Sequence, residues 1–356
     1  MRRTTAWAPG KLVILGEYAV LTAGEPGVVV AVDRGVRVNV LPQRSERARA
    51  GADALWAPAS GAWCLSPGGV VGAALASATS YLQAVAVPLS PFSLTVHSEL
   101  AGPHGKYGLG SSAAVVVAVV AAVLASAAPR TLHGDRSLLF KLAAQAHFRA
   151  QAAGSGIDVA AAVYGGWSQY ASPGHLWMAS AACQAPHVMA NRLWPHLAIR
   201  RLSPPAIHCL LMGFSGTSAG TSPRVARVRQ WQSTHPEAHR RFLSRSRVRV
   251  RSFVQRWTDG QMAASVADLA AARRLLCALG DEVGLVMESP TARRMHHLAL
   301  RQGGAAKPSG AGGGDCSVAL LPSADACAAV EEQWTAAGID VLNWGMGGSG
   351  AEWGRL

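Results

Sequence analysis

The order of apolar and polar residues predicts strands at the beginning of the chain. Residues 6–15 are typical of a strand that bends at Pro9-Gly10 and then continues into the core. Val28–Val32 and Val36–Val40 are two apolar runs separated by Asp33-Arg34-Gly35, which is a hairpin turn signal. We therefore expect two strands joined by a tight turn at this point.

Farther along, several segments have the apolar spacing of buried helices and strands. The pattern predicts helices over residues 70–85, 113–128 and 137–153, another helix from Ile157, and strands over residues 93–98 and 167–170. Residues 41–70 are polar and poorly patterned, and we interpret them as a variable excursion.

The pattern changes around Ser203-Pro-Pro205, where we place a boundary between two domains, residues 1–203 and 204–356. The second domain is predicted to contain strands over 208–213, 316–321 and 339–343, two or three helices up to Gly280, and a last helix over 324–337. Helices and strands are mixed in both halves, so the predicted class is α+β.

Two glycine-rich stretches indicate phosphate handling. Lys106-Tyr-Gly-Leu-Gly-Ser-Ser-Ala-Ala114 opens onto a predicted core helix, whose first N–H groups and positive dipole end favour an anion. The spacing matches neither GxxxxGK[ST] nor GxGxxG, and a simple Gly-Ser turn that caps a helix is the alternative. Residues 303–315 are mostly glycine and alanine and carry Lys307, Ser309 and Asp315, which favours backbone close to a ligand over a plain linker.

Polar residues at the ends of apolar segments are further candidates. Lys11 follows the predicted bend, and Glu17 and Tyr18 follow Gly16, although an exposed strand-end lysine would look the same. Asp158 starts an apolar helix directly after Gly154-Ser-Gly156. It is either a helix-capping acid or a carboxylate that orients a nucleophile or accepts its proton.

Composition restricts the classes of protein. The 356 residues are 50% hydrophobic, enough for a large core, and the net charge is +13 with a pI near 10.3. Arginines are dense only between Arg224 and Arg256, as a solvated face or as a positive field that attracts an anionic small substrate. No nucleic-acid-binding motif accompanies them, so we expect no nucleic-acid partner.

The remaining signals favour a cytoplasmic protein. Six cysteines form no CxxC pair and have no metal-ligand spacing, which is typical of a reduced compartment. The N-terminal residues lack an apolar segment of signal-peptide length, and the apolar run over 113–128 is short for a membrane span. We expect no membrane partner.

Three segments together resemble the three signature motifs of the GHMP kinases (galactokinase, homoserine, mevalonate and phosphomevalonate kinases). They are Ala8-Pro-Gly-Lys-Leu-Val-Ile-Leu-Gly-Glu-Tyr18, Lys106-Tyr-Gly-Leu-Gly-Ser-Ser112 and Lys307-Pro-Ser-Gly-Ala-Gly-Gly-Gly-Asp-Cys316. The resemblance implies an N-terminal domain like the second domain of ribosomal protein S5, a ferredoxin-like C-terminal domain and an active site in the cleft between them. Gly16-Glu-Tyr18 and Gly154-Ser-Gly-Ile-Asp158 are most similar to the bacterial, actinobacterial-type phosphomevalonate kinase branch.

That branch implies a reaction in the mevalonate route to isoprenoids: ATP and 5-phosphomevalonate give ADP and 5-diphosphomevalonate, with Mg²⁺ as cofactor, in a monomer or homodimer. Lys11, Lys106 and Asp158 would be catalytic, and Ser112 would be a Mg²⁺ ligand. The implied ATP-binding residues are Lys106, Gly108, Leu109, Gly110, Ser111, Ser112 and Ala113. The implied substrate-binding residues are Lys11, Glu17, Tyr18, Ser155, Gly156, Asp158, Ser309, Gly310 and Ala311.

Chemistry ranks these residues. The nucleophile is a phosphate oxygen, already mostly ionised at neutral pH because phosphate second pKa values lie near ~6. A strong base is then less necessary than alignment and charge cancellation, so we expect Lys11 and Lys106 to outweigh Asp158.

One segment departs from the family pattern. The family typically has Trp-Thr-Gly-x-x-Ala-Ser-Thr where this chain has Phe214-Ser-Gly-Thr-Ser-Ala-Gly-Thr221, so Gly220 replaces a serine that contacts substrate. Thr221, Ser222 or Ser218 are the possible substitutes. Mevalonate kinase or another GHMP small-molecule kinase, and a non-catalytic ATP-binding sensor on the same fold, are the alternative functions.

Overall fold

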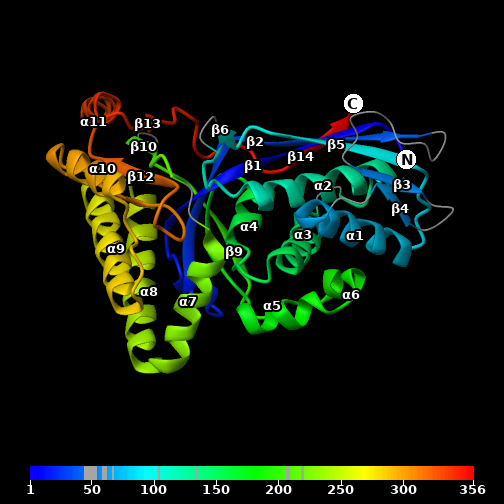
Figure 1. Cartoon of the computed structure of the whole chain (residues 1–356), viewed down its shortest axis with the longest axis horizontal. Coiled ribbons are helices and arrows are strands. Elements are labelled where there is room, and N and C mark those ends of the chain that lie inside the picture. Colours follow the sequence, from blue (N-terminus) through cyan, green and yellow to red (C-terminus); the bar gives the residue numbers. More distant parts are fainter. Residues whose placement is uncertain are drawn as a thin grey trace.

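A computed structural model describes residues 1–43, 54–57, 62–65, 68–102, 105–132, 135–205, 209–217 and 220–356. Figure 1 shows two lobes, one built on a long sheet with helices α1–α6 on one face, the other containing α7–α11 and a smaller sheet. Helices and strands alternate in both lobes, so the predicted α+β class is confirmed.

Among the described residues, eight strands form the first sheet, in the order β14-β1-β2-β5-β3-β4, with β8 and then β9 attached to β2. All its pairings are antiparallel. The strands are β1 (Thr4–Leu15), β2 (Pro26–Pro42), β3 (Ala54–Ala57), β4 (Ala62–Leu65), β5 (Phe92–Ser98), β8 (Trp167–Ala171), β9 (Ala198–Leu202) and β14 (Glu352–Arg355).

Helix α2 (Ser111–Ala127) is the centre of this lobe. Its alanine and valine side chains are small enough to pack on all sides, and almost every residue from Ala113 onwards is buried. It lies between β1 and β2 on one side and α1 and α3 on the other. The other helices are α1 (Gly69–Ala84), α3 (Arg136–Gln151), α4 (Ile157–Tyr164), α5 (His175–Ala182) and α6 (Pro186–Asn191).

The second sheet has the order β11-β12-β10-β13 within the described chain. One face packs against α10 and α11 around Met295 and Trp334, while Met212 and Phe214 face the larger core. The elements are β10 (Cys209–Phe214), α7 (Thr221–Thr234), α8 (Pro236–Thr258), α9 (Met262–Val283), α10 (Pro290–Arg301), β11 (Ala305–Pro308), β12 (Cys316–Leu321), α11 (Ala324–Ala336) and β13 (Asp340–Val341).

The predicted hairpin at Asp33-Arg34-Gly35 is wrong, because β2 continues through it. The register against β1 passes from Lys11↔Ala31 to Pro9↔Gly35, so a longer stretch of β2 opposes a shorter stretch of β1. The surplus residues bulge outwards, which leaves Asp33 and Arg34 exposed while the strand goes on. The polar residues therefore mark a bulge and not a turn.

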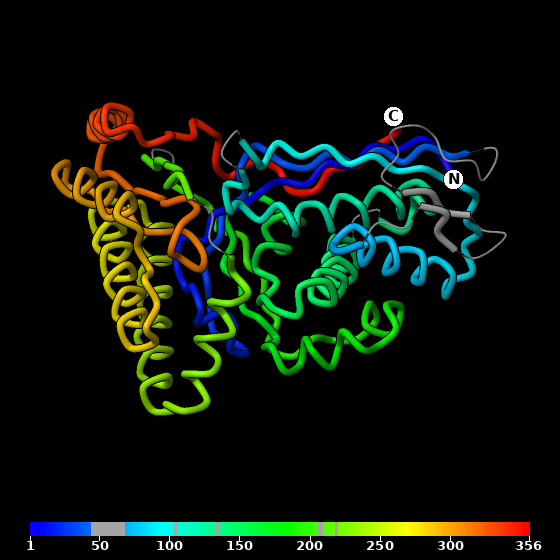
Figure 2. Tube along the Cα trace, viewed as in Figure 1, coloured from blue at the N-terminus to red at the C-terminus, as the bar shows by residue number. Residues whose placement is uncertain are grey.

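The C-terminal prediction also needs correction. The strand expected over 339–343 is reduced to β13, and it is not the last one, because β14 follows and pairs with β1. Figure 2 shows this red segment running beside the blue N-terminal strands. Of the excursion over 41–70, the structure describes the end of β2, strands β3 and β4 and the start of α1, and most of the rest lies outside the described residues. Every helix in the described part of the chain is too short or too polar to serve as a membrane span.

Candidate active site

A cavity of about 360 Å³ is lined by segments from both lobes. It lies between two loops, which we call the first glycine loop (residues 106–110) and the second glycine loop (residues 309–315). Thirteen of the residues predicted to form the site line it: Lys11, Glu17, Tyr18, Lys106, Gly108, Gly110, Ser111, Ser112, Ser155, Asp158, Ser309, Gly310 and Ala311.

Three predicted residues do not line this cavity. Leu109 and Ala113 turn their side chains into the core, where they are 1% and 0% exposed. Gly156 lies beneath the hydroxyl of Tyr170, since a Cβ at Gly156 would be 2.9 Å from that oxygen. These three residues shape the site through the backbone.

Lys11 stands at the irregularity in β1, between the two loops. Because the ladder to β2 is interrupted there, its backbone N–H donates to the carbonyl oxygen of Leu109 at 2.9 Å. Its ammonium donates to the carbonyl oxygen of Gly108 at 3.1 Å, and a Cβ at Gly310 would lie 4.0 Å from Nζ. The bend predicted at Pro9-Gly10 thus places a positive charge beside both glycine loops.

The first glycine loop needs its glycines for space as well as for conformation. Gly108 has φ +74, and a Cβ there would be 2.2 Å from Cγ of Asp315. Gly110 has φ +77, caps α2, and lies against the aliphatic part of Lys11. The first amide of α2 to bond within the helix turn is that of Ala114, to Gly110 at 3.1 Å, so the earlier N–H groups are available to an anion.

A histidine that the sequence did not reveal lies near both Ser112 and Asp158. Nε2 of His147, on α3, lies 3.0 Å from the Ser112 hydroxyl oxygen and 3.9 Å from Oδ2 of Asp158. The His147 side chain is 7% exposed. His147 belongs to no motif and lies on a different helix from either partner, so the packing of α3 against α2 and α4 brings it here.

Asp158 lies in the first turn of α4 and faces the cavity. One of its oxygens accepts the N–H of Val159 at 2.9 Å, and the other is the one near His147. The preceding turn is held by Tyr170, whose hydroxyl donates to the carbonyl oxygen of Ser155 at 2.6 Å. Burial raises the pKa of Tyr170, so this phenol stays a donor.

The second glycine loop is held by side chains from several elements. Ser309 accepts the N–H of Val13 at 2.8 Å, and the hydroxyl of Tyr18 donates to the carbonyl oxygen of Ala311 at 2.6 Å. Nε of Arg224, on α7, donates to the same oxygen at 3.0 Å. These contacts use hydrogen-bonding groups of Ser309 and Tyr18, two of the predicted substrate-binding residues, in building the site.

A buried ion pair lies under this loop. The Lys307 ammonium, which is 0% exposed, donates to the Glu17 carboxylate and also to the carbonyl oxygen of Pro308 at 2.7 Å. Burial raises the pKa of Glu17, and the Lys307 charge opposes that rise. Glu17 therefore borders the cavity while its charge is neutralised by Lys307.

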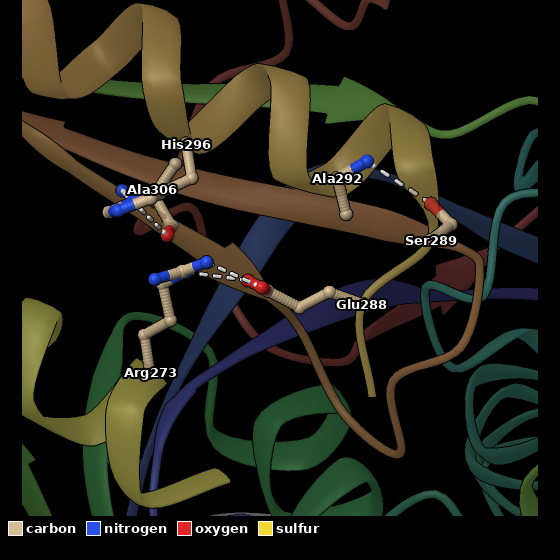
Figure 3. Close-up of polar contacts among 6 residues, drawn as sticks. All are labelled: Arg273, Glu288, Ser289, Ala292, His296 and Ala306. Carbon is tan, nitrogen blue, oxygen red and sulfur yellow. Dashed lines mark hydrogen bonds and ion pairs between the residues drawn. The ribbon is translucent and has the colours of Figure 1, made fainter. Parts of the chain in front are cut away.

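A second ion pair, between Arg273 and Glu288, is drawn in Figure 3 and fixes the segment that bonds to this loop. Arg273 on α9 holds Glu288 through two hydrogen bonds of 2.6 and 2.5 Å. Glu288 follows Met287, whose carbonyl oxygen accepts the N–H of Gly313 at 2.8 Å. In the same close-up, His296 of α10 lies 3.1 Å from the carbonyl oxygen of Ala306 on β11.

Asp315 lines the cavity although the sequence assigned it no role of its own. Asp315 is 8% exposed, has φ +56, and brings a further carboxylate to the cavity. Its place in the third motif was the available signal. Thr221 and Gly220 also line the cavity, whereas Ser222 does not and Ser218 lies outside the described residues.

The arginine-rich segment is partly neutralised within the fold. Arg247 pairs with Glu25, and Arg249 and Arg256 pair with the buried Asp268. With Arg224 engaged at the second glycine loop, much of this positive charge holds α7 and α8 in place.

Comparisons with known proteins identify this arrangement. Two family models match the chain, the GHMP kinases N terminal domain over residues 70–166 and the GHMP kinases C terminal over residues 262–340. The phosphomevalonate kinase of Streptomyces sp. (strain CL190) is 34% identical over 362 residues, which covers 93% of this chain and 94% of that protein. The chain belongs to the GHMP kinases.

Solved structures agree with that assignment. This GHMP kinase is similar to the Lin0012 protein from Listeria innocua, with a TM-score of 0.89, 27% identity and 100% of both chains covered. It is also similar to Streptococcus pneumoniae phosphomevalonate kinase in complex with phosphomevalonate and AMPPNP, with a TM-score of 0.80 and 25% identity over 97% of this chain and 100% of that one. The predicted family and its two-part fold are confirmed.

Proposed function

We propose that this GHMP kinase transfers the γ-phosphoryl group of ATP to the phosphate of 5-phosphomevalonate, giving ADP and 5-diphosphomevalonate. The observation that carries the proposal is the cavity, where two lysines and the amino end of α2 share one space with Asp158. The similarity of nearly the whole chain to the Streptomyces phosphomevalonate kinase also supports the proposal.

The roles follow from charge. The N–H groups at the start of α2, with Ser111 and Lys106, bind ATP phosphates, since a helix amino end favours anions. Lys11, between the two glycine loops, neutralises charge where the two phosphates meet. Asp158 orients the acceptor, whose phosphate oxygen is already ionised, and does not need to remove a proton.

A Mg²⁺ ion bound with the nucleotide would neutralise charge on the transferred group. The Ser112 hydroxyl is a hard oxygen ligand at the rim of the cavity, which suits this ion. Among the described residues, no group of three or more His, Cys, Asp or Glu side chains is arranged to hold a metal alone. That fits an ion whose other ligands are phosphate oxygens and water.

We further propose that residues 1–203 form the ATP-binding domain and residues 204–356 the second domain, with β14 crossing back to the first sheet. Cys183, Cys209, Cys277, Cys316 and Cys327 are free thiols, as expected for a cytoplasmic enzyme. The protein would act as a monomer or homodimer on a small molecule, without a nucleic-acid or membrane partner.

The deciding measurement is ADP release by the purified protein with MgATP and one acceptor at a time: mevalonate, 5-phosphomevalonate, 5-diphosphomevalonate, homoserine or galactose. We expect turnover with 5-phosphomevalonate alone, and loss of that turnover in Lys11→Met. Turnover on mevalonate instead would contradict the proposed acceptor, and ATP binding without turnover on any of the five would favour a sensor.

A further inference from the structure

His147 occupies a position that the motifs leave unexplained. It comes from α3, which supplies no motif, yet its Nε2 lies within 3.0 Å of the hydroxyl of Ser112 and 3.9 Å of the carboxylate of Asp158. Both partners line the cavity, whereas His147 lies behind them and is 6% exposed. Its side chain thus reaches the reacting groups only through Ser112 and Asp158.

The two distances define two different relations. At 3.0 Å, Nε2 and the Ser112 oxygen share a hydrogen bond, whereas 3.9 Å to Asp158 is beyond hydrogen-bond range. A serine can offer its lone pairs to a cation only when its own proton points elsewhere. In the tautomer that carries its proton on Nδ1, Nε2 of His147 accepts the hydrogen bond from this hydroxyl, and the same nitrogen faces Oδ2 of Asp158.

We propose that His147 is a positioning residue. It accepts a hydrogen bond from the Ser112 hydroxyl, so that the lone pairs of the serine oxygen point toward the nucleotide-bound cation, and it sets the distance between that oxygen and Asp158. This inference rests on the proposed function of Ser112 as a Mg²⁺ ligand. It adds that a single imidazole sets the distance between the group that binds the cation and the group that orients the acceptor. Outer residues of this kind typically change metal affinity or activity by ~10–100-fold when mutated.

The test uses Mn²⁺ as a probe for Mg²⁺ and reads metal binding, not turnover. Mn²⁺ affinity of the full-length protein saturated with AMPPNP would be measured by electron paramagnetic resonance for His147→Met and His147→Gln. Methionine fills a similar volume without an imidazole acceptor, so we expect Mn²⁺ affinity to fall by about 10-fold or more. Glutamine places an amide oxygen near the former Nε2, so we expect it to restore most of the affinity.

A double-mutant cycle locates the effect. Because His147 acts through Ser112, His147→Met should weaken Mn²⁺ binding no further in a Ser112→Ala background. His296→Met is the matched control, since His296 is a buried helical histidine that contacts the Ala306 carbonyl outside the cavity. It should lower thermal stability without changing Mn²⁺ affinity.

Equal Mn²⁺ affinity of wild type and His147→Met, or equal losses in the Met and Gln variants, would overturn the inference. Additive losses in the cycle would also overturn it. Thermal melts of each variant show whether it is folded. If His147→Met does not fold, the Mn²⁺ affinity of His147→Gln is compared with that of the wild type instead. If the wild-type protein phosphorylated 5-phosphomevalonate while His147→Met bound Mn²⁺ normally, only the role of His147 would fail. Binding changes without turnover on any acceptor would remove the proposed reaction and leave the role of His147 standing.

Discussion

The two glycine loops border the same cavity but are held in different ways. The first continues directly into α2, and its shape depends on glycines against which Asp315 and Lys11 pack. The second lies between two strands and has no helix of its own. The backbone N–H of Val13 on β1, Tyr18 in the following turn and Arg224 on α7 bond to it directly, and Arg273 on α9 supports it through Glu288. A loop carried by a helix needs the right local sequence, whereas a loop between strands depends on remote anchors.

Breaking the anchor of the second loop should give the largest effect. Lys307→Met leaves the carboxylate of Glu17 buried without its cation, and removing one partner of a buried pair costs about 3–5 kcal/mol. Urea denaturation would measure the loss in the free energy of unfolding. The control is Glu17→Gln/Lys307→Met, which removes both charges and should recover much of the stability. A wild-type midpoint for Lys307→Met alone would contradict the anchoring role.

Removing the charge between the loops should act on rate and not on stability. Lys11→Met takes away the ammonium beside both loops, and loss of one preorganised electrostatic group lowers kcat by about 10²–10³-fold. Asp158→Asn should cost less, because the acceptor phosphate needs no strong base. Steady-state kinetics with 5-phosphomevalonate would decide, and a larger loss in Asp158→Asn would reverse the ranking of these two residues.

A matched pair of alanine substitutions compares the loops directly. Gly108 and Gly310 both have positive φ, so an alanine at either position would be held in a strained conformation that costs about 1–2 kcal/mol. Only Gly108→Ala also drives a methyl group into Asp315, whereas the nearest atom at Gly310 is Nζ of Lys11 at 4.0 Å. We therefore expect Gly108→Ala to raise the KM for ATP more than Gly310→Ala does. Equal effects would show that space is not what the first loop requires.

The smallest effect is expected at Gly220, the cap residue of α7. It has φ −67 and ψ 122, and among the described residues the atoms nearest to a Cβ there belong to Pro223, the closest at 3.7 Å. Gly220→Ser should therefore fit, and it should change the free energy of unfolding by only a few tenths, ~0.3 kcal/mol. A new hydroxyl in the cavity should lower the acceptor KM by up to about 10-fold, the value of one hydrogen bond. An unchanged KM would show that this chain does not need a serine at position 220 to bind the acceptor.

The sequence predicted the local parts of this molecule well. Strand β12 has the predicted bounds, Cys316–Leu321, and α1 and α2 begin and end within two residues of the predicted helices. These elements are predominantly apolar segments, which stand out from the polar and glycine-rich residues around them. The prediction of a hairpin at Asp33-Arg34-Gly35 was wrong because a bulge exposes the same types of polar residue as a turn. Only the pairing of β2 with β1 distinguishes the two.

Long-range contacts could not be predicted from the sequence either, because they too depend on how separate elements pack. The motifs mark loops, but neither His147 nor the Lys307–Glu17 pair can be deduced from spacing, because their partners are brought together by the packing of separate elements. Strand β14 was missed too. A short segment, Glu-Trp-Gly-Arg, has little strand pattern until β1 offers it an edge.

Strand β14 has a consequence for biosynthesis. Until residues 352–355 have been made, β1 is left as an unpaired edge, open to pairing with other chains. The first lobe can thus collapse early on the ribosome, but its sheet gains its last strand only after the second lobe has been translated. A complete sheet in the first lobe therefore requires that the second lobe has been synthesised, and nascent chains that stop before Glu352 would be the ones most prone to aggregate.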